Sequence, residues 1–93
     1  MYRLEWKPIA ENDLLNIITF IAAESPVSAE HFALDIRARV EGLPAHPELY
    51  RVGRQRGTRE MVVHPNYLVV YRIVKTTIEI LRVKHAAQQW PGR

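Results

Sequence analysis

The side chains best suited to chemistry lie in the second half of the chain. His85 could transfer a proton near neutral pH. Arg59 and Arg72, with Glu79 close by on the strand pairing argued below, could hold an anion such as a phosphate or an acidic partner. Each feature also has a structural alternative, because charged clusters at sheet ends and single histidines at strand ends are common without any chemistry. The residue types alone leave both interpretations open.

A run of arginines, Arg51, Arg54, Arg56 and Arg59, is interleaved with glycines. Such a run indicates nucleic-acid binding only weakly, and a solvated loop is the simpler interpretation. Trp90, near the end of the chain, either folds back onto the core or anchors a partner, as tryptophans do at binding hot spots. Both alternatives stay open at this point.

No metal or other cofactor is expected from the sequence. The chain has no cysteine, so thiolate metal sites and disulfides are excluded. His31, His46 and His64 show no metal-ligand spacing with carboxylates. On the pairing argued below, Glu60 faces Tyr71, which predicts a buried hydroxyl satisfied by that carboxylate or by Arg82 on the diagonal.

Two helices precede these residues. Tyr2 to Trp6 alternates between apolar and polar residues and predicts a short strand, after which Pro8 suits the first position of a helix. Ser25 and Pro26 break the helical pattern and begin a second helix, which Gly42 and Pro44 end. The apolar stripes of these helices, which predict a helix hairpin, are Ala10, Leu14, Ile17, Ile18 and Ile21, and then Ala29, Phe32, Ala33, Ile36, Val40 and Leu43.

Three strands follow a polar loop over residues 44–57, near 58–64, 67–74 and 78–84. Pro65-Asn66 and Lys75-Thr76 are short enough for hairpin turns. With two-residue turns, one face collects Met61, Val63, Leu68, Val70, Leu81 and Val83, and the other collects Val62, Val69, Tyr71, Ile73, Ile78 and Ile80. The helices can cover only one apolar face, so we expect the second to bind a partner.

Length and composition fit one ordinary globular domain over residues 1–93. The apolar fraction is 47% and the charged fraction 25%, which excludes a disordered chain. No apolar run approaches the roughly 20 residues of a membrane helix, so we expect a cytoplasmic protein without a membrane partner. Eleven of the 13 basic residues lie at or after Arg37, whereas most acidic residues precede Val40. This asymmetry permits contact with nucleic acid or with an acidic protein.

Three segments taken together resemble the RelE/ParE superfamily of toxins from type II toxin–antitoxin modules. They are GTRE from Gly57, HPNYLVVYR from His64 and EILRVKHAAQQWP from Glu79. The resemblance covers nearly the whole chain and implies an α+β fold with an N-terminal strand, an antiparallel two-helix hairpin and a three-stranded antiparallel sheet. It also implies a small antitoxin whose C-terminal segment wraps the toxin. The residues we expect to bind it are Arg54, Arg56, Arg59, Met61, Val63, Leu68 and Val70.

The superfamily divides by activity. The stretch LRVKH, residues 81–85, resembles the ParE-like branch, which inhibits DNA gyrase by binding and has no catalytic set. The contact residues that this implies are Arg82, Lys84, His85, Gln88 and Trp90. The alternative is the RelE-like branch, ribosome-dependent endonucleases that cut mRNA, with Arg59, Arg72, Arg82 and His85 as working groups. Met61 and Leu68 stand where that branch has basic residues and cannot neutralise a phosphate, so the resemblance favours ParE.

Overall fold

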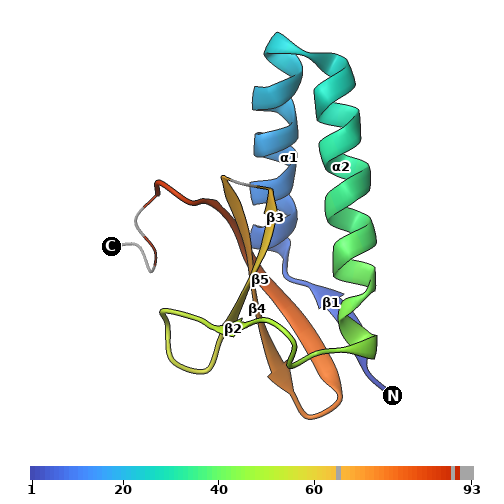
Figure 1. Ribbon diagram of the computed structural model, residues 1–93, viewed down its shortest axis with the longest axis vertical. Helices are drawn as coiled ribbons and strands as arrows, with labels where there is room; N and C mark the ends of the chain where they lie inside the picture. Colours follow the sequence, from blue (N-terminus) through green and yellow to red (C-terminus); the bar gives the residue numbers. More distant parts are fainter. Residues whose placement is uncertain (65, 89, 91–93) are drawn as a thin grey trace.

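A helix hairpin and a five-stranded sheet form the two layers of the fold (Figure 1). The computed structural model describes residues 1–64, 66–88 and 90. The elements are β1 (Arg3–Trp6), α1 (Pro8–Glu24), α2 (Pro26–Glu41), the short 3₁₀ helix η1 (Leu43–Ala45), β2 (Arg51–Val52), β3 (Arg59–His64), β4 (Tyr67–Val74) and β5 (Thr77–His85). The order confirms the α+β fold predicted from sequence.

The helix boundaries follow the signals in the sequence. Pro8 and Pro26 each occupy the first turn of a helix, where a missing backbone N–H costs no hydrogen bond. The Ser25 side chain accepts a hydrogen bond of 3.1 Å from the backbone N–H of Ser28, which caps α2. The predicted stripes face the sheet, with Ala10, Leu14, Phe32, Ile36 and Val40 all buried in one core cluster.

The sheet has the strand order β1-β5-β4-β3-β2. The first strand lies at one edge and runs parallel to β5, with Leu4 opposite Ile78. The two-residue β2 forms the other edge beside β3, within the segment predicted to be a loop. The predicted turn at 75–76 is present, because Val74 pairs with Thr77. At the first predicted turn His64 pairs with Tyr67, and Pro65 itself lies outside the described residues.

Two irregularities shift the pairing away from the predicted register. Beyond the first turn the register shifts between Val62 and His64, so Val62 faces Leu68. The second shift lies between Val70 and Tyr71, where Val70 faces Arg82. At each shift one strand of an antiparallel pair has one extra residue, which is the definition of a β-bulge. The predicted pairings of Arg59 with Arg72 and of Glu60 with Tyr71 are therefore wrong, and the predicted pairing of Arg72 with Glu79 is confirmed.

The two faces of the sheet differ in their cover. The inner face packs against the helices and includes Met61, Val69, Tyr71 and Ile80. We call the opposite side the outer face; it carries the alternate residues Glu60, Val62, Leu68, Val70 and Arg72. Leu68 and Val70 are buried without belonging to the helix-packed core, so apolar residues do occupy both faces.

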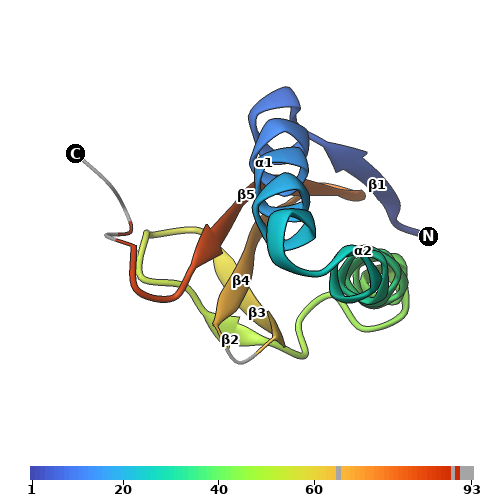
Figure 2. The same ribbon diagram turned by 90° about the horizontal axis from the view of Figure 1, so that it is seen from above.

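The chain itself lies along part of the outer face. The loop between β2 and β3 and the segment after β5 both lie on the side away from the helices (Figure 2). Val62 and Val74 on this face stay about half exposed. In the described part of the chain, neither helix is long and apolar enough to cross a bilayer.

Candidate binding surface at the end of the last strand

The residues expected to contact a target lie around the end of β5. Lys84 is opposite Leu68 and belongs to the outer face, whereas His85 is opposite Tyr67 and faces the helices. The rings of Tyr67 and His85 meet edge to face with centroids 5.1 Å apart. The predicted contact residues are therefore close in space but point to two sides of the sheet.

The chain turns sharply directly after His85. The backbone N–H of Ala86 donates to the carbonyl of Asn66 at 2.6 Å, and that of Gln88 donates to the carbonyl of His85 at 2.9 Å. The Gln88 side chain accepts from the backbone N–H of His85 at 2.6 Å. Gln88 thus closes the turn, and this bond occupies its side-chain oxygen.

The histidine ring also takes part in this turn. Its Nδ1 accepts a hydrogen bond of 3.0 Å from the backbone N–H of Ala87. An accepting Nδ1 places the proton of the neutral ring on Nε2, an assignment that follows from the hydrogen-bond network. In this arrangement Nε2 of His85 carries the N–H donor, and the bond from Ala87 occupies the lone pair of Nδ1.

Trp90 is half-buried and folds back toward the strand. The Nζ of Lys84 lies 5.9 Å from the centroid of the Trp90 ring, within range of a cation–π interaction. The indole Nε1 is buried and has no hydrogen-bond partner among the described residues. The ring folds back beside Lys84 and stays partly exposed, so this position is compatible with contact to a partner as well. Lys84 and Trp90 form a compact basic and aromatic corner beside the outer face.

Arg82 is held by the helix layer. Its Nε and Nη2 donate to the two carboxylate oxygens of Asp13 at 2.7 and 3.0 Å. The carboxylate raises the pKa of Arg82 above its usual range, because it stabilises the charged guanidinium. Arg82 is therefore fixed in place before any target binds.

The other arginines of the nuclease alternative do not converge. Nη1 of Arg59 donates to the carbonyls of Tyr50 at 2.8 Å and Glu48 at 3.4 Å. Arg59 is opposite Tyr71 on the inner face, whereas Arg72 lies on the outer face with its Nε 2.6 Å from Glu79. Each guanidinium is already bound to an acceptor of this chain. The structure does not gather these groups around one phosphate position.

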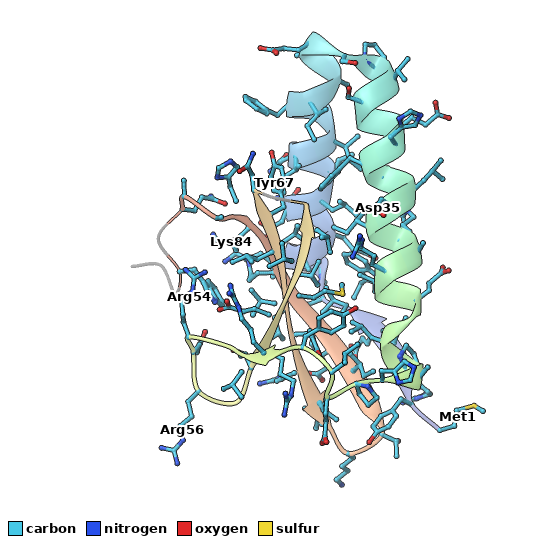
Figure 3. The ribbon with its side chains drawn as sticks, viewed as in Figure 1. Met1, Asp35, Arg54, Arg56, Tyr67 and Lys84 are labelled. Carbon is cyan, nitrogen blue, oxygen red and sulfur yellow. The ribbon has the colours of Figure 1, made fainter. Side chains whose placement is uncertain are left out.

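A buried carboxylate organises the arginine-rich loop. Glu60 is 2% exposed, and its oxygens accept from Arg51 Nη2 at 3.1 Å and from the backbone N–H of Arg54 at 3.0 Å. Gly57 has φ +83°, a left-handed conformation that suits glycine. The loop holds Arg54 toward the outer face and extends Arg56 away from the body of the protein (Figure 3).

The apolar residues expected to bind an antitoxin are not exposed. Met61 and Val63 are buried against the helices, and Leu68 and Val70 are buried on the outer face. The expectation that these four residues share one face is wrong, because the irregularity near Val63 separates them. Arg59 also lies apart from Arg54 and Arg56, since its guanidinium is bound on the inner face.

Sequence reasoning missed the exposed apolar residues of the helix hairpin. Leu15, Phe20, Val27 and Leu34 are each more than half exposed. All four lie off the core stripes, and that pattern could have identified them as surface residues.

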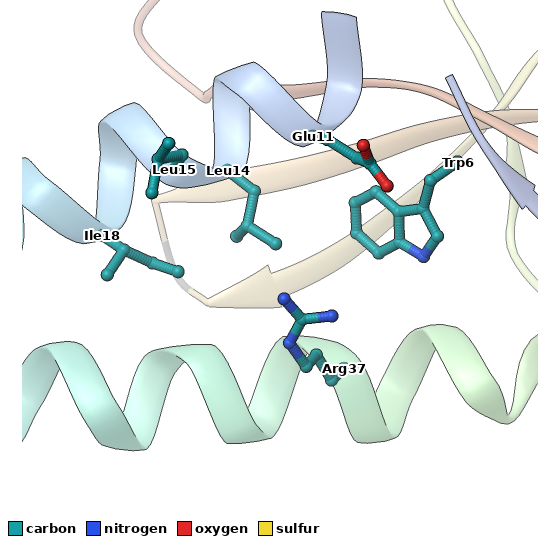
Figure 4. Close-up of a pocket in the computed structure, with 6 residues that line it drawn as sticks. All are labelled: Trp6, Glu11, Leu14, Leu15, Ile18 and Arg37. Carbon is teal, nitrogen blue, oxygen red and sulfur yellow. The ribbon is translucent and has the colours of Figure 1, made fainter. Parts of the chain in front are cut away.

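A groove lies between the two helices beside the first strand (Figure 4). It has a volume of about 230 Å³ and is lined by Trp6, Glu11, Leu14, Leu15, Ile18 and Arg37. Arg37 reaches from α2 toward α1, and Glu11 lies beside the indole of Trp6. An apolar floor with one acid and one base at its rim suits an amphipathic segment of a partner.

Among the described residues, no three acidic or histidine side chains gather to hold a metal ion.

Comparison with known proteins assigns the chain to a family. It is 37% identical over 90 residues to Y4kP of Sinorhizobium fredii, covering 96% of this chain and 93% of Y4kP. It is 32% identical over 83 residues to the toxin RelE2 of Caulobacter vibrioides, covering 89% of this chain and 91% of that protein.

Solved structures agree with these relatives. A chain of the chromosomal ParDE toxin–antitoxin system of P. aeruginosa superposes with a TM-score of 0.79 at 25% identity, covering 91% of this chain and 96% of that one. A chain of the RelBE2 toxin–antitoxin complex of Mycobacterium tuberculosis gives 0.56 at 26% identity, covering 90% and 96%. The family model of the ParE toxin of the type II toxin–antitoxin system parDE matches residues 4–90, and the chain belongs to this family of toxins.

Proposed function

We propose that this toxin inhibits DNA gyrase by binding it through the end of β5, and that a cognate antitoxin neutralises it. The observation that carries the proposal is the Lys84–Trp90 corner, a cation and an aromatic ring held together beside a structured turn. Aromatic and basic side chains in such fixed positions dominate the energy of many interfaces. Binding that prefers one state of an enzyme traps that state without any chemistry by the toxin.

The family assignment supports a target of the ParE type. The side chains of the nuclease alternative support it further, because Arg59, Arg72 and Arg82 are each bound within the chain. A protein that acts by binding does not need several cationic side chains around one phosphate. His85 and Gln88 then act by shaping the turn that presents Trp90.

A gyrase cleavage assay tests the target. Purified toxin is incubated with gyrase, supercoiled plasmid and ATP, and linear DNA is scored after denaturation. We expect cleaved complexes with the wild type and at least tenfold fewer with Lys84→Ala or Trp90→Ala, or when residues 86–93 are deleted. Residues 89 and 91–93 of this tail lie outside the described residues.

The matched control removes a positive charge at the other end of the same hairpin. Lys75 sits in the β4–β5 turn with φ +57°, a conformation that asparagine tolerates. Lys75→Asn should therefore keep full activity in the gyrase assay. Equal loss with Lys75→Asn and Lys84→Ala would show that net charge, and not the corner, governs inhibition.

For the antitoxin we propose two contact regions. An amphipathic segment would occupy the groove between the helices, whose lining includes Leu15, and would extend to the exposed Leu34, three residues before Arg37 on α2; acidic residues would meet Arg54 and Arg56. Leu34→Glu should weaken the complex with the antitoxin at least tenfold in calorimetry and leave the fold intact, because Leu34 is 63% exposed. If Leu34→Glu left the affinity for the antitoxin unchanged, the helix hairpin would not be part of the interface.

An mRNA endonuclease is the second candidate, and the similarity to the toxin RelE2 favours keeping it. It predicts ribosome-dependent cuts in mRNA that His85→Ala abolishes while the fold stays intact. Such cuts, together with no cleaved gyrase complexes, would replace the gyrase proposal. Cleaved complexes without mRNA cuts would exclude the nuclease.

A further inference from the structure

The first strand leaves one edge of the sheet open. β1 is the last strand of the sheet on its side, and within the described residues β5 is its single neighbour. The backbone N–H of Arg3 donates to the carbonyl of Thr76, just before β5, at 2.8 Å, and that of Lys7 donates to the carbonyl of Ile80 in β5 at 2.9 Å. Because N–H groups alternate along a strand, those of Leu4 and Trp6 point to the free edge. A free edge is a template for pairing with another strand.

The residues at equal distances on either side of Leu4 are complementary to one another. Reading outward from that residue, Arg3 is matched by Glu5 and Tyr2 by Trp6. Tyr2, Leu4 and Trp6 pack on the helix side of the sheet, and Arg3 and Glu5 lie on the outer face. Charges of opposite sign thus stand at equal distances from the centre of one short strand.

The charges beside this edge are incompletely paired. Arg72, Glu79 and Glu5 lie side by side across the sheet, with Arg72 Nε 2.6 Å from Glu79. Lys7 bridges the two acids, with Nζ 3.3 Å from Glu5 and 3.5 Å from Glu79. Arg72 lies at one end of this row and Glu5 at the other, beside the free edge, where Lys7 is the one ion-pair partner of Glu5 among the described residues. Arg3 makes no ion pair within the described chain.

We propose that β1 pairs antiparallel with β1 of a second copy of this chain, about a two-fold axis at Leu4. This register brings Arg3 of each copy opposite Glu5 of the other, and Tyr2 opposite Trp6. Arg3 then supplies the cation at the open end of the row of charges. Leu4 has its N–H at the free edge, so the two Leu4 residues form a hydrogen-bonded pair, and Arg3 and Glu5 meet as the closer, non-hydrogen-bonded pair.

The pattern favours a second copy over an unrelated strand. A two-fold interface places one surface against itself, so it requires opposite charges at symmetric positions, and the strand from Tyr2 to Trp6 has them. Cross-strand pairs of opposite charge and of aromatic rings both stabilise sheets. The contact is short, so we expect a weak dimer that depends on concentration. The proposal is independent of the toxin's target.

Charge reversal tests the pairing by sedimentation velocity over a wide range of concentration. Arg3→Glu places two acids opposite two acids in its own dimer, and Glu5→Arg places bases opposite bases. We expect each variant alone to dimerise at least tenfold more weakly than the wild type. An equimolar mixture restores both ion pairs in a heterodimer and should recover association. Circular dichroism and thermal melts check that both variants fold.

A disulfide tests the register. The chain has no cysteine, so Leu4→Cys introduces a single thiol. In the proposed pair the two Cα atoms are about 5.5 Å apart, a distance that a disulfide spans. We expect a covalent dimer on oxidation, and only slow random cross-linking from Val74→Cys, which is 41% exposed. A wild type that stays monomeric, or a dimer insensitive to both reversals, would overturn the proposal.

Discussion

Asp13 and Arg82, which are 69 residues apart in the chain, form a two-point ion pair between α1 and β5. The same carboxylate accepts a hydrogen bond of 3.0 Å from the backbone N–H of Val83. This N–H lies just beyond the point where β1 stops covering the edge of β5, with Trp6 opposite Ile80. Beyond the end of β1, Asp13 therefore supplies the acceptor that a neighbouring strand would supply. It holds in place the end of β5 that leads into the C-terminal segment.

Asp13→Asn should destabilise the protein by about 1–2 kcal/mol. Hydrogen bonds to charged groups contribute about 1.5–3 kcal/mol, and the partial exposure of this pair reduces its value. Urea unfolding at neutral pH measures the change. The control is Asp35→Asn, whose ion pair with Arg39 is about half exposed on both sides and should contribute at most about 0.5 kcal/mol. Similar losses from both variants would contradict the role assigned to Asp13.

Glu60→Gln should destabilise the loop between β2 and β3. The carboxylate side chain is 1% exposed and faces Arg51 and Arg54, so an amide of the same size leaves two cations without their shared partner. We expect a loss of about 1–3 kcal/mol in urea unfolding. Trypsin should also cleave at Arg54 and Arg56 faster than in the wild type. An exposed acid, Glu48, provides the control as Glu48→Gln, which should change neither measurement.

Tyr71→Phe isolates one buried hydrogen bond. The hydroxyl donates to the carbonyl of Pro47 at 2.7 Å and ties the segment after η1 to the middle of the sheet. Phe fills the same space but leaves that carbonyl without its donor, which should cost about 1–2 kcal/mol. Tyr2→Phe, where the structure gives the hydroxyl no bond among the described residues, should be nearly neutral. Equal stability of the two variants would contradict this view of Tyr71.

The phenol of Tyr71 also reports on its surroundings. Burial raises its pKa above the usual value, and the nearby charge of Arg59 acts in the opposite direction. In an ultraviolet titration of the folded protein, one phenol should therefore ionise later than the others. That late step should be absent from Tyr71→Phe.

The helix hairpin could be predicted from sequence because its signals are local. Pro8, Ser25 and Pro26 fix the helix starts, and the spacing of apolar residues fixes the buried faces. The turn at 75–76 and the short connection between His64 and Tyr67 could be predicted for the same reason. These elements depend on residues within a few positions of each other.

The register of the sheet could not be predicted, because it depends on contacts that are distant in sequence. One strand has an extra residue near Val63 and another has one at Leu81. Each extra residue displaces the pairing by one position on one side of it. In runs of apolar residues that suit both faces, nothing local opposes such a shift. The partners of Arg59, Glu60 and Arg82 were missed for the same reason, since each lies in another element.

Glu79 should make stability depend on pH in the acid range. The Nε of Arg72 donates to its carboxylate at 2.6 Å, and this bond, with help from Lys7, lowers the pKa of Glu79 below its usual value. A lowered pKa in the folded state contributes stability above the pKa of the unfolded chain, about 4.3 for glutamate. That contribution is lost as the pH falls from there through the folded pKa. The wild type should exceed Glu79→Gln in stability at pH 7, and the difference should shrink steadily between about pH 5 and pH 3.

Urea unfolding of both proteins at several pH values measures this difference directly. Glu24→Gln is the control, because Glu24 is exposed and makes no ion pair among the described residues. Its difference from the wild type should stay close to zero throughout. Arg72→Gln should reproduce most of the effect of Glu79→Gln, since it removes the first cause of the lowered pKa. A difference between the wild type and Glu79→Gln that stays constant from pH 7 to pH 3 would mean that the ion pair makes no contribution, and that the side chain acts only through its packing.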